Sequence, residues 1–324
     1  MGVAGRVTIA IPTLNRATLA VRAVKSALAQ TYSGLEVLVS DDASNDDTAT
    51  RIGGIEDSRL AFIRQRERLG LAGNFDFCLR RATGEFFLLM GDDDVLLPDA
   101  IERLVSPFLE PPRMLQPQSI GLVWCPCLIA GPDGNLLWST QGGPGLESPA
   151  DLLSELWAGR RGLRLSGILM RTADALAAGG FQERHGDLCD LGTWGAAALS
   201  HDYVVCINQP LVQYTNHYGS KTSRSSIREW QDWARIVHAD LVKCARARCG
   251  REGEQKLERA RRNLISGITL TILIQRIGSR GWAGSAFREA FRSPGALFTS
   301  YVFRRFVNDG WKLLRLGGNH NPHV

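Results

Sequence analysis

Three consecutive carboxylates follow a strongly apolar segment in the first third of the chain. Residues 86–90 predict a buried strand, and Asp92, Asp93 and Asp94 follow after one glycine. An ionised carboxylate without a partner is very costly to bury, so these charges must lie beyond the strand, at the carboxyl edge of its sheet. Adjacent carboxylates also raise one another's pKa unless a cation lies between them. The pattern favours a site where Mg²⁺ or Mn²⁺ bridges carboxylate to diphosphate oxygens.

A solvated acidic loop that caps a helix beginning near Pro98 is the alternative interpretation of these three residues. Two other polar segments favour the functional one, because they also follow apolar strands: residues 12–16 and residues 41–48. The carboxyl ends of parallel strands meet at one sheet edge. Asp41 at a strand tip can accept a hydrogen bond from a nucleobase N–H, and the turn of Thr13 and Asn15 can hold backbone toward a nucleotide.

The elements that must position these residues alternate along the chain. The 324 residues are 44% hydrophobic and 22% charged, as in an ordinary globular protein with a sizeable core. Apolar runs predict strands at 7–11, 35–39, 60–63 and 86–90, and helical spacing predicts helices at 17–30, 48–52 and 74–81. Short links between alternating strands and helices predict an α/β protein with a parallel, doubly wound sheet.

The middle of the chain predicts further strands after a Pro-rich linking loop at residues 110–119. These strands cover residues 120–124, 166–171 and 203–207, and Thr172 caps a helix that reaches residue 178. Residues 131–134 are a turn signal between two short apolar segments. Residues 141–149 are expected to form a flexible loop on the acceptor side of the site.

The carboxyl-terminal region differs in charge. Residues 1–226 hold 20 Lys and Arg against 25 Asp and Glu, whereas residues 227–324 hold 18 against 8. Helical periodicity appears at 227–248 and 252–277, and residues 282–316 interleave aromatic and basic side chains. That interleaving suits an interfacial helix on an anionic bilayer, and equally a helical subdomain that packs its aromatic residues on the catalytic domain. No recognised nucleic-acid motif accompanies the basic charge, so we expect no nucleic-acid partner.

Cysteine usage and apolar stretches indicate a cytoplasmic protein. The seven cysteines lack paired metal-site spacing, which favours reduced, mostly buried thiols. The first residues lack the pattern of a signal peptide, and the longest apolar stretch, residues 264–274, is too short to span a bilayer. We therefore expect a cytoplasmic location, with peripheral association at the inner face of the membrane if the basic tail binds lipid.

Four motifs in order carry a resemblance to a known family. The chain resembles the family-two inverting glycosyltransferases with the GT-A fold at Pro-Thr-Leu-Asn-Arg (12–16), Asp-Asp-Ala-Ser-Asn-Asp-Asp-Thr (41–48), Gly-Glu-Phe-Phe (84–87) and Gly-Asp-Asp-Asp-Val-Leu-Leu-Pro-Asp (91–99). The resemblance runs from residue 7 to about residue 222. It implies a GT-A catalytic domain with a Rossmann-like mixed sheet over residues 1–225, and a helical extension over residues 226–324.

The resemblance also implies the chemistry. It implies a nucleotide-diphosphate sugar donor, Mn²⁺ or Mg²⁺ on the diphosphate, and direct transfer to an acceptor hydroxyl with inversion at the anomeric carbon. The acceptor implied is a growing surface glycan on a lipid carrier, with a soluble small molecule as the alternative. The residues implied to bind the nucleotide sugar are Pro12, Thr13, Asn15, Arg16, Asp41, Asn74 and Asp92; those implied to hold the metal are Asp93, Asp92 and His217.

The implied general base is Asp190, where the family carries an Asp ahead of a helix. An inverting transfer needs one carboxylate to remove the proton of the acceptor hydroxyl. A helix N-terminus would fix the position of Asp190 and lower its pKa. The simpler alternative is that Asp190 only caps the helix, and Asp187 is the reserve candidate for the base.

Three positions depart from the family pattern, and two of them, Cys189 and Thr215, keep a non-catalytic sugar-nucleotide-binding protein open as an alternative. Gly91 stands where the first Asp of the acidic motif is common, Cys189 where a Glu is usual, and Thr215 where an Arg is usual. Lys221 or Arg224 could compensate for that missing arginine. A nucleotidyltransferase of similar fold is disfavoured, because residues 12–15 provide neither a Gly-rich loop nor a basic residue after the first strand.

Overall fold

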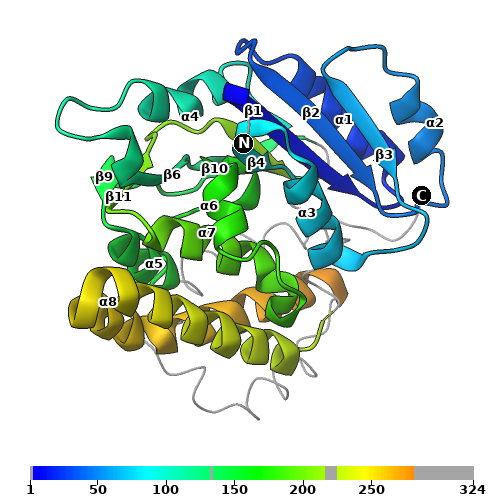
Figure 1. Cartoon of the computed structure of the whole chain (residues 1–324). Coiled ribbons are helices and arrows are strands. Elements are labelled where there is room, and N and C mark those ends of the chain that lie inside the picture. The colour runs from blue at the N-terminus through cyan, green and yellow to red at the C-terminus, as the bar shows by residue number, and fades with distance from the viewer. Residues whose placement is uncertain (1–2, 132–133, 216–224, 281–324) are drawn as a thin grey trace.

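The amino-terminal half alternates strands and helices, as the sequence predicts. The computed structural model describes residues 3–131, 134–215 and 225–280. The strands of this half are β1 (Val3–Thr13), β2 (Leu35–Asp41), β3 (Leu60–Arg64) and β4 (Gly84–Leu89), and its helices are α1 (Ala17–Leu28), α2 (Thr48–Gly53), α3 (Gly70–Arg81) and α4 (Ala100–Leu109). These four strands are parallel in the order β3-β2-β1-β4. Their carboxyl ends therefore meet at one edge of the sheet (Figure 1).

The second half of the sheet is mixed, which confirms the mixed sheet that the family resemblance implies, whereas the alternating strands and helices of the first half indicated only the parallel part. In the described part of the chain the large sheet has eight strands in the order β3-β2-β1-β4-β10-β6-β11-β9. The four added strands are β6 (Ile120–Trp124), β9 (Leu146–Glu147), β10 (Ile168–Arg171) and β11 (Tyr203–Cys206). β10 runs antiparallel to both β4 and β6. Apolar runs reveal a buried strand but not its direction, because either direction buries the same side chains.

A small second sheet lies next to the acid cluster. Within the described residues it contains β5 (Val95–Leu96), β7 (Cys127–Ala130), β8 (Leu136–Ser139) and β12 (Val212–Thr215) in the order β5-β12-β7-β8. β7 and β8 pair antiparallel on either side of the predicted turn. β12 pairs with β5, directly after the three carboxylates, and thereby brings Thr215 beside them.

Alternate residues of β4 enter two different cores, one on each face of the large sheet. Phe86 and Leu88 pack with residues of α1 and α4, whereas Phe87 and Leu89 pack with residues of α3 and of helices from the second half. This alternation is the two-residue period of a strand. Those later helical elements are α5 (Pro149–Trp157), α6 (Thr172–Ala177), α7 (Cys189–Leu199) and α8 (Ile227–Arg280), with short 3₁₀ turns η1 (Pro117–Ser119), η2 (Leu165–Gly167) and η3 (Glu183–Leu188).

The helical extension has the two segments that its periodicity predicts. Gly250, with φ of +64°, breaks α8 into two parts. The two parts pack antiparallel, because Gln231 bonds to Thr269 and His238 bonds to the carbonyl of Leu257. They lie against α5, α7 and η3 (Figure 1). Buried side chains of α8 belong to the same hydrophobic core as those of α7.

The two alternatives for the aromatic and basic segment of the carboxyl-terminal region, an interfacial helix on a membrane or packing on the catalytic domain, stay predictions. The aromatic and basic segment at 282–316 lies outside the described residues. Among the residues that the structure does describe, no helix has both the length and the apolar character needed to cross a membrane.

Candidate active site

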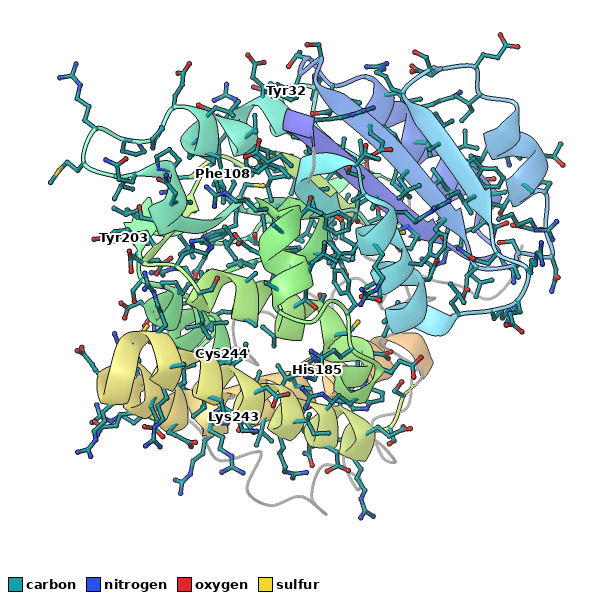
Figure 2. The ribbon with its side chains drawn as sticks, viewed as in Figure 1. Tyr32, Phe108, His185, Tyr203, Lys243 and Cys244 are labelled. Carbon is teal, nitrogen blue, oxygen red and sulfur yellow. The ribbon has the colours of Figure 1, made fainter. Side chains whose placement is uncertain are left out.

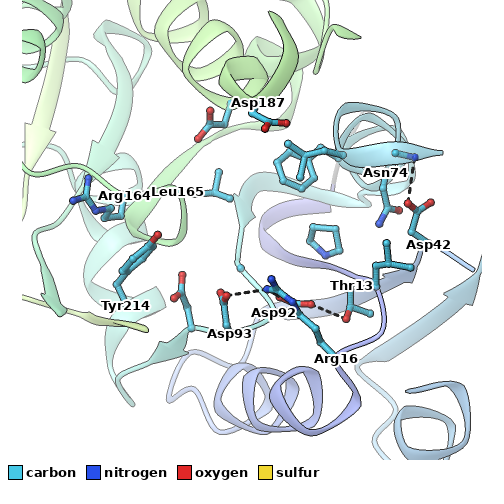
Figure 3. Close-up of a pocket in the computed structure, with 18 of the residues that line it drawn as sticks. Thr13, Arg16, Asp42, Asn74, Asp92, Asp93, Arg164, Leu165, Asp187 and Tyr214 are labelled. Atoms are coloured by element: carbon cyan, nitrogen blue, oxygen red, sulfur yellow. Dashed lines mark hydrogen bonds and ion pairs between the residues drawn. The ribbon is translucent and has the colours of Figure 1, made fainter. Parts of the chain in front are cut away.

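One pocket at the carboxyl edge of the large sheet brings most of the predicted site residues together. Its volume is about 770 Å³. Figure 3 shows Asp187 across the pocket from Asp92 and Asp93. Of the predicted site residues, the following line it: Pro12, Thr13, Asn15, Arg16, Asn74, Asp92, Asp93 and Asp190, with the reserve candidate Asp187.

Asp92 and Asp93 share one guanidinium. Arg16, at the start of α1, donates from Nη1 to Asp92 Oδ1 at 3.0 Å and to Asp93 Oδ2 at 2.9 Å (Figure 3). The Thr13 hydroxyl donates to the other oxygen of Asp92 at 2.8 Å. Burial raises the pKa of Asp92 to about 6, and the charge of Arg16 opposes that rise. The Arg16 guanidinium is thus the cation that lies between these two carboxylates.

Asp94 also lines the pocket, but both of its carboxylate oxygens are bonded to other parts of the protein. Its Oδ2 accepts from the Ser166 hydroxyl, and its Oδ1 accepts from the backbone N–H of Thr215 at 3.1 Å. Burial, and next the charge of Asp93, raise the pKa of Asp94. Asp94 thus ties β12 to the end of β4. A Cβ at Gly91 would lie 3.0 Å from carboxylate oxygens of Asp93 and Asp94, which gives a steric reason for glycine at that position.

The carboxylate oxygens at this wall suit a hard cation whose coordination shell is completed by a bound ligand. Among the described residues, no three His, Cys, Asp or Glu side chains converge as a ready-made metal site. Asp92 and Asp93 are two adjacent carboxylates at the pocket wall, and Mg²⁺ is usually held by one or two carboxylates plus substrate phosphates. His217, predicted as a further ligand, lies outside the described residues, as do Lys221 and Arg224.

Thr215 has a structural role in place of the family's arginine. Its hydroxyl donates to the backbone carbonyl of Asp93 at 2.6 Å and accepts from Arg22 Nη2 at 2.9 Å. Arg22, on α1, also donates to the same carbonyl of Asp93. Arg22 therefore helps to hold the backbone of the acid cluster in place. The sequence carries no local signal of this contact, because Arg22 and Asp93 are 71 residues apart.

The loops after β1 and β2 form the other end of the pocket. Asn15 has φ of +54°, and its backbone N–H donates to Ser44 while its side chain accepts from the N–H of Asn45. Ala43 has φ of +56° in the facing loop. Left-handed backbone at residues other than glycine is uncommon and gathers at ligand sites. Asn74 is buried and bonds to Ser40 at the tip of β2.

Asp42, rather than the predicted Asp41, lines the pocket. Asp41 is completely buried, pairs within the sheet with neighbours on both sides, and accepts from the N–H of Ser44. Asp42 is the first residue beyond β2, and it accepts from the N–H groups of Leu69 and Gly70 at the start of α3 (Figure 3). Neighbouring residues of a strand point to opposite sides, so a one-residue difference in where β2 ends decides which carboxylate faces the pocket.

Asp187 and Asp190 lie on the opposite wall. Asp190 is in the first turn of α7, and its Oδ1 accepts from the N–H of Leu191 at 2.7 Å. Asp187 accepts from the Ser225 hydroxyl at 3.1 Å. Burial raises the pKa of Asp190 to about 6, and the nearby Asp187 adds to that rise. The expected lowering by the helix N-terminus is therefore wrong, because the loss of hydration outweighs the backbone N–H groups.

The remaining pocket wall comes from residues that the sequence analysis did not assign to the site. Arg164 lies over the ring of Tyr214, with its guanidinium carbon 5.5 Å from the ring centroid. Aromatic residues line the end nearer Asp190, including Trp194 of α7 and Trp230 of α8. Tryptophan inside a helical pattern ordinarily indicates a core position, so the sequence alone does not identify Trp194 and Trp230 as pocket residues.

The fold and part of the sequence are similar to those of known proteins. The structure is similar to the crystal structure of S. aureus TarS 1–349 in complex with UDP, with a TM-score of 0.61 and 14% identity over 93% of this chain and 91% of that one. At that identity the likeness shows the fold alone, a GT-A-like mixed α/β sheet with a helical carboxyl-terminal region. Residues 8–121 match the family model described as Glycosyl transferase family 2. This part of the chain is therefore similar to the family-two glycosyltransferases.

Curated relatives match over a similar length. The GalNAc(5)-diNAcBac-PP-undecaprenol beta-1,3-glucosyltransferase of Campylobacter jejuni is 36% identical over 104 residues, which is 31% of this chain and 34% of that protein. The UDP-Glc:alpha-D-GlcNAc-diphosphoundecaprenol beta-1,3-glucosyltransferase WfgD of Escherichia coli is 31% identical over 104 residues, 32% of this chain and 41% of that protein. The chain thus spans between a third and two fifths of the length of these two relatives.

Proposed function

We propose that this protein transfers a sugar from a nucleotide-diphosphate donor to an acceptor hydroxyl, with inversion at the anomeric carbon and with a divalent metal ion. The observation that carries the proposal is the opposition of two acidic pairs in one pocket. Asp92 and Asp93 lie on one wall, and Asp187 and Asp190 lie on the other. A donor held between them would have its diphosphate at the first pair and its sugar directed toward the second.

The donor end of the pocket supports a nucleotide diphosphate. Thr13 and Asn15 line its wall, and Asp42, in place of Asp41, offers a carboxylate to a nucleobase N–H. Asp92 and Asp93 would hold Mg²⁺ or Mn²⁺, with His217 as a proposed third ligand. The bound ion would offset the negative charge that develops on the leaving diphosphate. Arg16 would then be free to turn from the carboxylates toward the phosphate oxygens.

At the acceptor end of the pocket, Asp190 is the proposed general base. Asp190 would take the proton of the acceptor hydroxyl as that oxygen attacks the anomeric carbon from the face opposite the diphosphate. The new bond is the glycosidic C–O bond, and the bond that breaks is the one between the anomeric carbon and the diphosphate oxygen, which keeps the electron pair. A carboxyl whose pKa is raised to about 6 is a better proton acceptor than an ordinary aspartate and is still ionised at neutral pH.

The relatives support a lipid-linked acceptor in surface polysaccharide synthesis. Both named relatives act, by their names, on sugars carried by diphosphoundecaprenol. We propose the same class of acceptor here, and peripheral association with the membrane that carries it. A UDP-hexose is the first donor to test, because the name of the E. coli relative specifies UDP-Glc.

Thermal unfolding with nucleotide and metal tests the donor half of the proposal. A ligand that binds only the folded state at one hundred times its Kd stabilises it by about 2.7 kcal/mol, so UDP with Mn²⁺ should raise the Tm of the full chain. Asp93→Asn should lose the part of the shift that needs Mn²⁺. Asp57→Asn is the matched control, because Asp57 is paired with Arg59 and is not among the pocket residues.

A transfer assay tests the catalytic half. Full-length protein, UDP-glucose, Mn²⁺ and a diphosphoundecaprenyl-linked N-acetylhexosamine should yield a disaccharide with the linkage inverted. Binding of UDP without transfer to any lipid-linked acceptor would favour the non-catalytic alternative. If no nucleoside diphosphate shifts the Tm with either ion, the proposal is wrong from its first step.

A further inference from the structure

The turn that carries Asp187 and leads to Asp190 is pressed against α8. Gly186, in the middle of this turn, has φ of +54°, a backbone conformation that L side chains rarely adopt. A Cβ at Gly186 would lie 2.1 Å from the ring of Trp233 on α8, so backbone and indole are in direct contact. The glycine permits both the left-handed backbone and the close approach of the helix.

A buried histidine ties the same turn to α8 by a hydrogen bond. His185, labelled in Figure 2, is 3% exposed, and its Nε2 lies 2.9 Å from Asp240 Oδ2. Its other nitrogen, Nδ1, has no hydrogen-bond partner among the described residues and faces Gly192 of α7, whose added Cβ would lie 2.4 Å away. Nε2 is therefore the ring nitrogen that donates to the carboxylate of Asp240. Arg184 strengthens the attachment with an ion pair to Asp240 at 2.8 Å.

The start of α8 reaches the pocket as well. Ser225, two residues before the helix, donates to Asp187, and Trp230 lines the pocket near Asp190. The segment that carries Asp187 and Asp190 thus has three contacts with α8 and with the residues just before it. These contacts come from Ser225, Trp233 and Asp240. The turn itself is a short 3₁₀ segment with a non-helical residue inside, so its own backbone bonds do little to hold it.

We propose that His185 and Asp240 are positioning residues. Through these two residues, α8 holds the turn of residues 183–190 in the position from which Asp190 reaches the acceptor hydroxyl. This inference rests on the proposed function. It assigns to the helical extension a part in the transfer step, whereas the donor pocket on the far wall depends on β1, β2 and β4. A misplacement of about 1 Å at a reacting group can cost on the order of a hundredfold in rate.

The variants Asp240→Ala and Asp240→Asn test this assignment. Asp240→Ala removes the acceptor, and we expect kcat to fall by about tenfold to a hundredfold while the donor KM stays within about twofold. Asp240→Asn keeps an oxygen that accepts from His185, and it should restore most of the lost kcat. The matched control is Arg248→Ala, which breaks another attachment of α8, the 2.7 Å pair with Asp202.

Hydrogen exchange separates a failure of this inference from a failure of the proposed function. Amides of residues 183–190 should exchange faster in Asp240→Ala than in the wild type, and should be unchanged in Arg248→Ala, whether or not the protein transfers sugar. Equal exchange in all three proteins would overturn the inference. Equal losses of kcat in Asp240→Ala, Asp240→Asn and Arg248→Ala would also overturn it, because the effect would then be one of general stability.

Discussion

Arg16 stands between the two carboxylates that are proposed to hold the metal. Its Nη1 bonds to Asp92 and Asp93 at about 3 Å, so a metal ion and this guanidinium compete for the same oxygens. A guanidinium cannot lose its proton in a protein, and it can therefore leave the acid pair only by moving. At the residue scale, Arg16 neutralises the acid pair, and under the proposed function a bound ligand would draw Arg16 away from these carboxylates.

Removing this competitor should strengthen metal binding in the absence of nucleotide. In Arg16→Gln the two carboxylates lose their counterion, so we expect the affinity for Mn²⁺ alone to rise about tenfold, which corresponds to about 1.4 kcal/mol. Calorimetric titration with MnCl₂ measures it. Arg51→Gln is the control, since it removes the same charge from a residue on the surface of α2. Weaker Mn²⁺ binding in Arg16→Gln would show that Arg16 supports the ion rather than competing with it.

The pH dependence of transfer should report Asp190. A general base works only without its proton, and burial raises the pKa of Asp190 to about 6, so kcat should fall as the pH drops below about 6 and level off above it. Asp187→Asn removes a negative neighbour and lowers the pKa of Asp190, and the fall should then begin at a lower pH. Asp190→Asn should reduce kcat by about a hundredfold to ten-thousandfold.

Glu183→Gln provides the matched control for this pH experiment, because Glu183 is exposed on the same turn. It makes the same change of charge as Asp187→Asn without touching the pocket, and its pH profile should match that of the wild type. An Asp190→Asn protein that transfers sugar at the wild-type rate would contradict the assignment of the base.

At the scale of elements, short contacts between distant strands complete the site. β5 begins directly after Asp94 and pairs with β12, which comes more than a hundred residues later. That pairing lets the N–H of Thr215 hold Asp94, which lines the pocket together with Asp92 and Asp93. Antiparallel β10 has a similar effect, because its entry turn places Ser166 against Asp94.

At the scale of the whole molecule, the helical extension and the catalytic domain share one core. Trp230, Leu241 and Leu257 of α8 are buried in the cluster that also contains Trp194 of α7 and Trp157 of α5. Full burial of one such side chain contributes about 1.5–3 kcal/mol, and a domain has about 5–15 kcal/mol of net stability. The predicted domain of residues 1–225 thus depends on surface that α8 covers.

Truncation before α8 should therefore abolish cooperative folding. A chain of residues 1–225 should aggregate or unfold without a clear transition, because the apolar faces of α5 and α7 would be exposed to water. A chain of residues 1–280 retains α8 and serves as the control. Circular dichroism during urea unfolding distinguishes the two. A cooperative transition of the 1–225 chain at the wild-type midpoint would instead support an independent domain that ends at residue 225.

Local pattern determined much of the architecture. The order and type of the elements from β1 to β4, the turn between β7 and β8, and the two segments of α8 were predictable because apolar periodicity, glycine and proline act over a few residues. The acid cluster was predictable for the same reason, since three charges cannot continue a buried strand. Thr13, Arg16 and Asp190 line the pocket because each lies at the end of a strand or at the start of a helix, whereas Asn74 reaches the pocket from within α3.

Tertiary contacts decided the rest. The direction of β10, the choice of Asp42 over Asp41, the bonding of Asp94 to Thr215 and the raised pKa of Asp190 all depend on which distant segments meet. The attachment of His185 to Asp240 joins residues 55 positions apart in the chain. Periodicity states that a side chain will be buried but not against what, and the partner in the folded chain sets its hydration, its charge and its role.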